Sequence, residues 1–358
     1  MKKIVLTGGG TAGHVTPNIA LLPALQAAGY EIAYVGSYEG IEKKLIADFN
    51  IPYTGISTGK FRRYLDPKNF SDPFRVMKGF VEARNYLKNY QPDVVFSKGG
   101  FVSVPVVRAA ASLHIPCIIH ESDMTPGLAN KLCIPVAEKV CCNFPETMKN
   151  IPADKAVLTG SPIRAELAQG SKLVGLNMCG FTANKPVIMV IGGSLGAANV
   201  NKAVRDALPK LLEDFQVVHL CGKDKIDNLL LNTPGYKQFE YIKAELKDIF
   251  AMADVVISRA GANAICELLA LKKPNILIPL PAASSRGDQL LNAASFEAQG
   301  YSIVLNEDDI TTNLLVAKVH ELYFNRQNYV DAMSKSHQMD AVKTIMELIN
   351  AAAEKKKN

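Results

Sequence analysis

Residues 4–14 read IVLTGGGTAGH. This stretch indicates the fold class, because four apolar or β-branched residues predict a buried strand and the glycines after them predict a tight turn. An apolar segment of helical length then begins at Pro17, and proline is favoured at the first position of a helix. A strand that ends in glycines ahead of a helix gathers backbone N–H groups at the positive end of the helix dipole. We therefore expect a site for an anion or another polar ligand at this turn.

The same alternation continues along the chain and predicts an α/β protein. Short β-branched runs alternate with amphipathic segments of helical length, which is typical of parallel sheets covered by helices on both faces. In the first half we expect strands at 4–7, 32–35, 94–96, 117–120, 139–142 and 156–158, and helices at 17–28, 76–90 and 104–113. The pattern pauses around 160–162 and restarts with strands at 187–191, 217–220, 255–258 and 276–279.

The restart resembles the beginning of the chain. Residues 188–193 read IMVIGG, beside IVLTGG at residues 4–9. At 358 residues the chain also exceeds what one hydrophobic core usually organises. We expect two similar nucleotide-type domains, one at 1–162 and one at 163–337, with a cleft between them and a helix at about 338–354 that returns to the first domain.

Composition limits the class of protein. The formal net charge of +6 accompanies 34 acidic residues, which argues against a nucleic-acid binder and suits an anionic substrate or membrane surface. The seven cysteines include no Cys-x-x-Cys pair, so we expect reduced thiols in a cytoplasmic protein. The first apolar run is too short for a signal peptide, and no run reaches the roughly 18 residues of a membrane span. Any contact with lipid is then peripheral.

Glycine spacing leaves a second class of enzyme open. Gly8, Gly10 and Gly13 fit the Gly-x-Gly-x-x-Gly pattern of dinucleotide folds, which makes a nicotinamide or flavin enzyme an alternative. That pattern requires an acidic residue at the end of the second strand to bind a ribose hydroxyl. Residues 35–37 are instead Val-Gly-Ser, and Glu39 comes late. A third possibility is a binding protein that keeps the fold without turnover. The glycines themselves have a simpler alternative, which is that they only make tight turns between strand and helix.

Two features of the second half suit a nucleotide. The turn GGSLG at 192–196 again follows a strand, and the hydroxyl of Ser194 would suit a phosphate. Glu267 lies near the start of a helix after the strand at 255–258, and its carboxylate can accept two hydrogen bonds from ribose hydroxyls. The alternative for Glu267 is an acid that complements the helix dipole.

Six motifs in order carry a family resemblance. They are GGGTAGH at 8–14, KGGFVS at 98–103, HESD at 120–123, GSPIR at 160–164, GGSLG at 192–196 and RGDQ at 286–289. Together they resemble the N-acetylglucosaminyltransferases of peptidoglycan synthesis. The resemblance implies a GT-B fold, with two Rossmann-like parallel-sheet domains facing across a cleft. It also implies inverting transfer of N-acetylglucosamine from UDP-GlcNAc to a lipid-linked N-acetylmuramyl-pentapeptide (lipid I), giving lipid II at the cytoplasmic face of the membrane. Another GT-B enzyme, such as a diacylglycerol glycosyltransferase or a UDP-GlcNAc epimerase, is the nearest alternative.

The resemblance also implies site residues. The backbone near Ile242 would meet the uracil, Glu267 the ribose and Gln289 the sugar, with the phosphates at Ser194 and the helix opening at 262–266. The expected UDP-GlcNAc-binding set is Thr11, Ala12, Gly13, Arg164, Ser194, Ile242, Ala262, Asn263, Ala264, Ile265, Cys266, Glu267 and Gln289. The expected acceptor-binding set is Gly99, Gly100, Phe101, Ser103 and Asn130. Asp123 and Asp288 depart from the family pattern, and we assign them no contact.

The chemistry requires a base and a means of neutralising the departing diphosphate. His14 ends the first glycine turn, and histidine titrates near neutral pH, so we expect it to take the acceptor proton. Glu121 is the alternative base. The chain contains no Asp-x-Asp triplet, so we expect no metal and no cofactor, with the diphosphate left to helix N-termini, Arg164 and a second cation at Arg259.

One segment suits a membrane surface. Residues 60–65 read KFRRYL, and apolar residues then recur at helical spacing beside cations. The apolar residues are Phe70, Phe74, Met77 and Val81, and the cations are Arg75, Lys78 and Arg84. Such a face suits anionic lipid. An ordinary helix that packs this stripe on its own sheet is the alternative.

Overall fold

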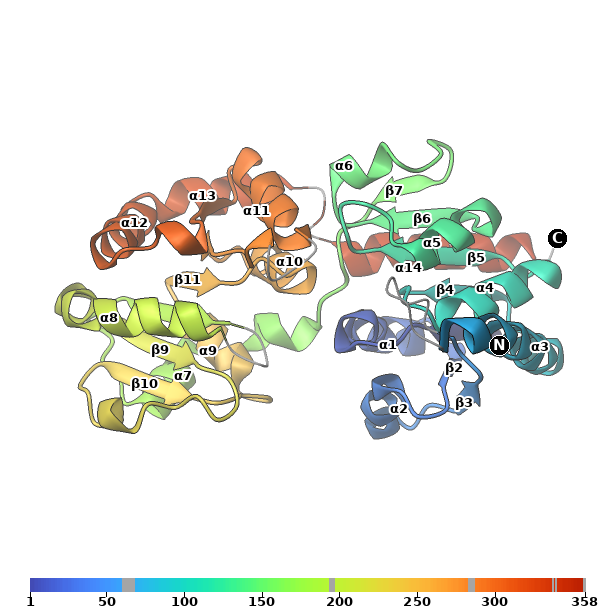
Figure 1. Ribbon diagram of the computed structural model, residues 1–358, viewed down its shortest axis with the longest axis horizontal. Coiled ribbons are helices and arrows are strands. Elements are labelled where there is room, and N and C mark those ends of the chain that lie inside the picture. Colours follow the sequence, from blue (N-terminus) through green and yellow to red (C-terminus); the bar gives the residue numbers. More distant parts are fainter. Residues whose placement is uncertain (60–67, 193–196, 283–286, 337, 339, 357–358) are drawn as a thin grey trace. The chain divides into compact units, whose positions relative to one another are not determined.

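The computed structural model describes residues 1–59, 68–192, 197–282, 287–336, 338 and 340–356, with side chains for all of these except 68–71. The chain forms two compact units, one from residues 1–164 with 340–358 and the other from residues 165–339. Each unit contains one open parallel sheet with helices packed on it (Figure 1). The predicted α/β fold class is therefore confirmed.

The first unit is built on a seven-stranded parallel sheet in the order β3-β2-β1-β4-β5-β6-β7. Its strands are β1 (Lys2–Thr7), β2 (Tyr30–Ser37), β3 (Tyr53–Ile56), β4 (Val94–Ser97), β5 (Cys117–Glu121), β6 (Lys139–Cys142) and β7 (Ala156–Leu158). Its helices are α1 (Thr16–Ala27), α2 (Ile41–Ile46), α3 (Lys68–Tyr90), α4 (Ser103–Ser112), α5 (Leu128–Cys133), α6 (Pro145–Met148) and α14 (Ala341–Lys355), with short 3₁₀ turns η1 (Ala12–His14), η2 (Ala47–Phe49) and η3 (Ile134–Val136).

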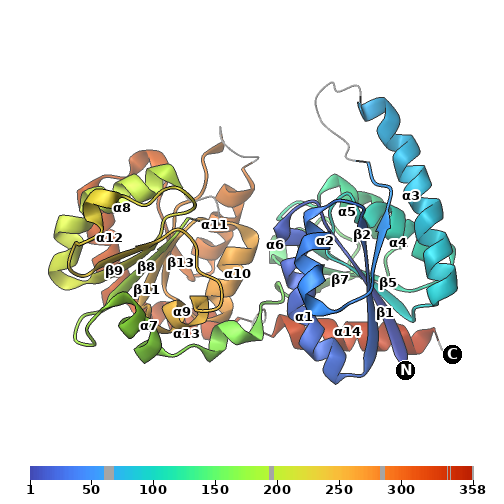
Figure 2. The same ribbon diagram turned by 90° about the horizontal axis from the view of Figure 1, so that it is seen from below.

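Two separate apolar clusters hold the helices of the first unit on the sheet. On one face, α1 and α14 pack together, with Leu21 and Ile349 both fully buried against β1 and β4 residues (Figure 2). On the other face α3 packs along α4, with Leu87 and Val106 in the core (Figure 2). Burying side chains of this size stabilises the fold by about 1.5–3 kcal/mol each. The chain's last helix is thus part of the first unit's core.

The second unit is built on a six-stranded parallel sheet in the order β10-β9-β8-β11-β12-β13. Its strands are β8 (Val187–Ile191), β9 (Gln216–Leu220), β10 (Tyr236–Phe239), β11 (Val255–Ser258), β12 (Asn275–Leu277) and β13 (Ser302–Val304). Its helices are α7 (Lys172–Cys179), α8 (Ala198–Asp214), α9 (Leu246–Met252), α10 (Ala262–Ala270), α11 (Asp288–Ala298), α12 (Thr312–Phe324) and α13 (Arg326–Ser334), with 3₁₀ turns η4 (Ala165–Gln169), η5 (Asn228–Leu230) and η7 (Glu307–Asp309).

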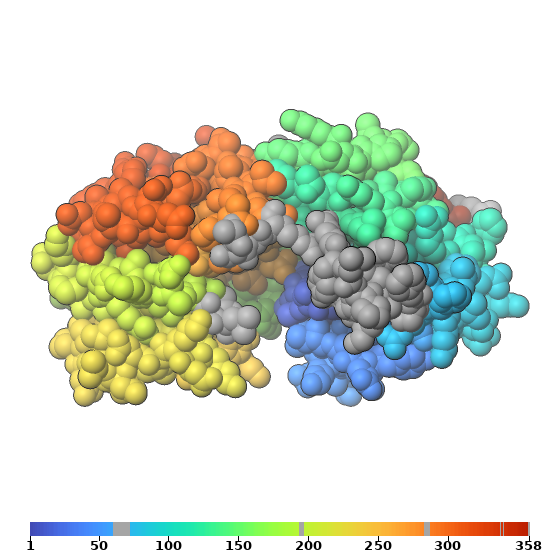
Figure 3. All heavy atoms as spheres, in the orientation of Figure 1, coloured from blue at the N-terminus to red at the C-terminus, as the bar shows by residue number. Residues whose placement is uncertain are grey.

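Helices α8 and α12 cover one face of the second sheet. Val204 and Leu211 of α8 are fully buried there, in a cluster that includes Val319 of α12. The outer side of α8 is polar, and on it Lys202 pairs with Asp206 at 2.5 Å. This helix contributes to the surface seen in Figure 3. The amphipathic pattern of this segment thus accounts for its position on the sheet.

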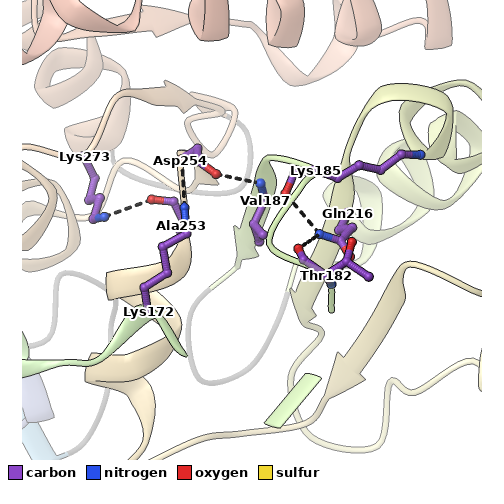
Figure 4. A network of polar contacts seen from close by, with 8 residues as sticks. All are labelled: Lys172, Thr182, Lys185, Val187, Gln216, Ala253, Asp254 and Lys273. Atoms are coloured by element: carbon purple, nitrogen blue, oxygen red, sulfur yellow. Dashed lines mark hydrogen bonds and ion pairs between the residues drawn. The ribbon is translucent and has the colours of Figure 1, made fainter. Parts of the chain in front are cut away.

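In both sheets, an aspartate directly before a central strand accepts a hydrogen bond from a backbone N–H of the neighbouring strand. In the second unit, Asp254 precedes β11 and its Oδ2 accepts a hydrogen bond from the backbone N–H of Val187 at 2.8 Å, while Lys172 Nζ lies 3.7 Å from Oδ1 (Figure 4). In the first unit, Asp93 precedes β4 and accepts from the N–H of Lys3 at 2.7 Å. The resemblance between the two halves of the sequence therefore extends to side-chain contacts.

Strand prediction succeeded in the middle of both sheets and at the edge strand β7, and it failed at the other three edges. The predictions at 139–142, 156–158, 187–191 and 255–258 match the observed strands in full. Strands β3, β10 and β13 were not predicted, and all three lie at sheet edges. None of the helices in the described residues combines the length and apolar character needed to cross a membrane.

Candidate active site

The first two glycine turns lie against each other because β1 and β4 are neighbours in the sheet. Thr7 is paired with Ser97 at the ends of these strands, and the N–H of Lys98 donates to the carbonyl of Thr7 at 2.9 Å. The backbones beyond them touch: a Cβ on Gly100 would lie 2.2 Å from the carbonyl oxygen of Gly9. Only glycine permits this approach. The predicted turns at 8–14 and 99–103 thus form one surface.

Phe101 completes the contact between the turns. A Cβ on Gly10, where φ is 85°, would lie 2.5 Å from Cε1 of the Phe101 ring. Thr11 and Ala12, which follow Gly10, are exposed, while Gly13 and His14 are half-buried. The outer part of the turn is therefore accessible to a ligand, and its inner part is packed.

His14 lies in η1 with its ring beside the second turn. Its Nδ1 is 2.9 Å from the hydroxyl oxygen of Thr11. Burial and the nearby positive charge of Lys98 lower the pKa of His14 to about 4, against the smaller opposing effects of the Gly9 carbonyl and Glu42. The imidazole is therefore neutral at pH 7 and able to accept a proton.

Two buried basic residues beneath these turns were missed as functional candidates. Lys98 is only 1% exposed, and its Nζ contacts the hydroxyl of Ser122. His120 is fully buried, with Nε2 2.9 Å from the carbonyl oxygen of Gly160. Burial and Lys98 lower the pKa of His120 well below its usual value. The sequence did hold a signal for Lys98, because a lysine closely follows the predicted strand at 94–96. That strand, β4, is the neighbour of β1, which places Lys98 beside the first glycine turn.

Glu121 lies at the end of β5 and organises the loop that follows it. Its Oε1 accepts from the N–H of Asp123 at 2.8 Å, and its Oε2 accepts from the N–H of Gly127 at 3.0 Å and from Nδ2 of Asn130 at 2.9 Å. The carboxylate is 3% exposed, and burial raises its pKa. These contacts favour a structural role for Glu121 over the role of base.

The predicted acceptor residues divide into surface and interior positions. Gly99 and Gly100 form the turn itself, with φ of 91° and 85°. Ser103 is fully buried, and its hydroxyl donates to the carbonyl of Gly99 at 2.8 Å. Asn130 is buried beside Gly99, where its side chain is bonded to Glu121. Ser103 and Asn130 therefore shape the turn from below, whereas Gly100 and Phe101 remain candidates for direct contact.

In the second unit, the predicted phosphate site is the start of α10. Gly261 is the N-cap residue, and Ala262, Asn263 and Ala264 are half-buried. The first N–H groups of a helix have no partner within it and favour an anion. The N–H of Ile265 already donates to the carbonyl of Gly261 at 3.1 Å. Because the side chains of Ile265 and Cys266 are buried, the first three helical residues are better placed for contact with a phosphate.

The other residues predicted to bind UDP-GlcNAc differ in how deeply they are buried. Glu267 and Gln289 are half-buried on α10 and α11, and Oε1 of Gln289 accepts from the N–H of Leu280 at 3.1 Å. Ile242 is 5% exposed, so its side chain belongs to the core and only its backbone suits a nucleobase. Arg164 is half-buried at the end of the first unit. Ser194 and Arg286 lie outside the described residues.

The structure contradicts the assignment of Arg259 as a cation for the diphosphate. Its guanidinium is paired with the carboxylate of Glu307, and NH1 donates to the carbonyls of Ile278 at 3.0 Å and Pro279 at 3.2 Å. The residue is 8% exposed. Glu307 also accepts from Nδ2 of Asn199 at 2.6 Å. Arg259 therefore braces the loops after β11 and β12, because its charge is already neutralised.

Within the described residues, no group of three or more His, Cys, Asp or Glu side chains is arranged to hold a metal ion. All seven cysteines are buried and unpaired with one another. Burial raises the pKa of the Cys141 and Cys142 thiols to about 12, which makes them poor metal ligands and poor nucleophiles. Metal-independent chemistry stays a prediction.

Comparison with known proteins identifies the family. The N-terminal domain model of glycosyltransferase family 28 matches residues 4–142, and the C-terminal domain model of the same family matches residues 187–349. The chain belongs to glycosyltransferase family 28. The predictions of a glycosyltransferase and of a GT-B fold are thereby confirmed, and the nicotinamide enzyme is ruled out.

Individual members of family 28 and of its fold class are similar over nearly the whole chain. A relative from Lachnospira eligens, named UDP-N-acetylglucosamine--N-acetylmuramyl-(pentapeptide) pyrophosphoryl-undecaprenol N-acetylglucosamine transferase, is 65% identical over 349 residues, 98% of this chain and 99% of the relative. The crystal structure of Acinetobacter baumannii MurG has a TM-score of 0.77 and 28% identity, and the match covers 98% of this chain and 100% of that one. A UDP-GlcNAc 2-epimerase from Methanocaldococcus jannaschii shares the fold alone, with a TM-score of 0.68 and 14% identity over 97% of this chain and 99% of that one.

Proposed function

We propose that this family 28 glycosyltransferase transfers N-acetylglucosamine, with inversion, from UDP-GlcNAc to the lipid-linked N-acetylmuramyl-pentapeptide, giving lipid II. The observation that carries the proposal is 65% identity, over 98% of the chain, to a relative named for this transfer. The epimerase fold neighbour is only 14% identical, so the fold alone would not distinguish the two reactions.

In the proposed reaction the acceptor hydroxyl attacks the anomeric carbon of the donor sugar. The new C–O bond forms as the bond to the diphosphate breaks, the hydroxyl proton passes to the neutral His14 ring, and UDP departs with the electron pair. The first N–H groups of α10, at Ala262 and Asn263, favour the negative charge that develops on the diphosphate. We expect the guanidinium of Arg164 to favour the same developing charge.

The decisive experiment is transfer of radiolabel from UDP-GlcNAc to a synthetic short-chain lipid I. We expect one labelled product that co-migrates with the short-chain lipid II analogue. Hydrolysis or 2-epimerisation of the sugar nucleotide without transfer would refute the assignment. The same assay with EDTA tests independence of metal, since product that forms only without the chelator would contradict that part of the proposal.

We further propose that α3 contacts an anionic lipid surface at the cytoplasmic face of the membrane, where the acceptor lipid resides. Phe74, Met77 and Val81 are 79%, 65% and 51% exposed, so this stripe does not pack on its own sheet. Arg75 and Lys78 lie on the same helix and are also exposed. Exposed apolar side chains flanked by cations suit the headgroup region of an anionic bilayer. Phe70 and residues 60–65 lie outside the described side chains.

A further inference from the structure

The carboxylate of Glu42, on α2, lies beneath the first glycine turn and has no role in the reaction proposed above. Its Oε2 accepts from the N–H of Gly10 at 3.1 Å. Its Oε1 accepts from the N–H of Ser37 at 3.0 Å and from the Ser37 hydroxyl. The side chain is fully buried, where a carboxylate is tolerated only with such donors. Glu42 thus ties the turn to the end of β2.

Three glycines enclose this carboxylate so closely that it has one position. A Cβ on Gly9 would lie 2.5 Å from Cδ of Glu42, and a Cβ on Gly40 would lie 2.1 Å from Oε1. A Cβ on Gly36 would lie 2.8 Å from Cγ. Real side chains do not approach this closely, so no residue with a Cβ fits at these three positions. The turn, the end of β2 and the start of α2 are therefore all packed against the Glu42 side chain.

The turn at 8–14 depends on such a support because of its composition. Four of its seven residues are glycine, and glycine loses more backbone freedom on ordering than any other residue. Gly10 adopts a φ of 85°, and its N–H is fixed by Glu42. Tyr34 gives a second support, since its hydroxyl donates to the carbonyl of Gly8 at 2.8 Å.

We propose that Glu42 is a positioning residue for sugar transfer, which fixes the turn at 8–14, and with it the His14 ring, through the amide of Gly10. The proposal rests on the proposed function in that it takes His14 as the base. Glu42 also affects the protonation of His14. Its negative charge raises the pKa of the ring, while the positive charge of Lys98, directly after β4, lowers that pKa more strongly.

The test compares Glu42→Gln with Glu39→Gln, a matched change at an exposed acid three residues earlier. Glutamine keeps the shape but turns one acceptor oxygen into a donor, which then opposes the N–H of Gly10 or of Ser37. We expect kcat to fall about 100-fold in Glu42→Gln, the effect of a misplaced catalytic group. The Kd for UDP should change far less than kcat, because most of the expected UDP contacts lie in the second unit, which is untouched. Glu39→Gln should behave as wild type.

Hydrogen exchange by NMR gives a readout that does not require turnover. The amide protons of Gly10 and Ser37 should exchange faster in Glu42→Gln, while those of β5, β6 and β7 keep their wild-type protection. If Glu42→Gln does not fold, Ser37→Ala removes only the hydroxyl donor and should give the same local change in weaker form. Wild-type kcat together with wild-type exchange at Gly10 would overturn the inference. Absence of transfer by the wild-type protein would count against the proposed function instead, and the exchange experiment would still decide the role of Glu42.

Discussion

At the scale of single residues, the site consists of a few polar groups whose protonation is set by burial. His14 is neutral because it is packed between two turns and faces Lys98. Glu121 also lies at the end of a strand, but three N–H donors already occupy its oxygens. The two candidate bases thus differ in what surrounds them, a difference that their residue types do not reveal.

The first prediction concerns His14→Ala. We expect kcat to fall by about 10²–10⁴-fold, the usual contribution of a general base, with the Kd for UDP unchanged. The acid limb of the wild-type kcat/KM profile should lie near pH 4 to 5 and not near 6.5, because the pKa of His14 is lowered to about 4. Steady-state kinetics on the short-chain acceptor measures both quantities. Near-wild-type turnover in His14→Ala would show that the base is another group.

Lys98→Met tests the electrostatic part of this account. Methionine fills a similar volume without the charge, so the His14 cation is no longer disfavoured by a neighbour. The pKa of His14 should rise from about 4 toward its ordinary value, and the acid limb of kcat/KM should move to higher pH. An acid limb that stays in place would mean that burial alone determines the pKa of His14.

The sequence allowed us to predict the site residues that directly follow strands. It did not allow us to predict residues whose contacts depend on segments that are distant in sequence. The glycine turns and His14 are contiguous with predicted strands, so strand order alone brings them together. Glu42 was missed because the acid was sought at the end of β2, whereas the chain first turns through Gly40 and returns its side chain from α2. Arg259 was misassigned because its partner, Glu307, is distant in sequence and follows an edge strand that was not predicted.

At the scale of elements, central strands were predictable because burial on both faces requires continuous apolar runs. Edge strands have no such requirement. β10 reads Tyr-Lys-Gln-Phe, with alternating burial, and β13 has three residues. β3 contains Gly55, which disfavours a strand, and pairs with β2 along one side only. Pairing with a formed neighbour, which a single sequence does not show, determines these three strands.

The prediction at this scale concerns the exposed stripe of α3. The variant Phe74→Ser/Met77→Ser/Val81→Ser should lose co-sedimentation with vesicles of anionic phospholipid and retain wild-type kcat on a water-soluble short-chain acceptor. Because all three side chains face solvent, the thermal unfolding temperature should not fall. Equal sedimentation of the variant and the wild-type protein would contradict a membrane role for α3. Val106→Ser, in the core beneath α3, is the control that should unfold.

At the scale of the whole molecule, buried neutral histidines couple stability to pH in both units. His120 is fully buried in the first unit and His219 in the second, and burial lowers the pKa of both, to about 3 for His219. The unfolded chain takes up protons near pH 6.5 while the folded chain does not, so stability falls as pH drops below 6.5. His219 should cost about 2 kcal/mol between pH 7.5 and pH 5, and His120 acts in the same direction.

Urea unfolding at pH 7.5 and pH 5 measures this loss. The midpoint should fall for both units, and His219→Gln should reduce the pH dependence of the second unit while leaving that of the first unchanged. A midpoint that does not change between the two pH values would mean that burial does not lower the pKa of these histidines in the folded protein.

Helix α14 also has a consequence for how the protein is made. Residues 165–339 leave the ribosome as a continuous segment and contain everything that the second unit needs for its sheet. The first unit is synthesised earlier, yet Ile345 and Ile349, which its core requires, emerge only after the second unit. The half that is translated first is therefore completed second, and until then the apolar surface around Leu21 lacks its partners from α14.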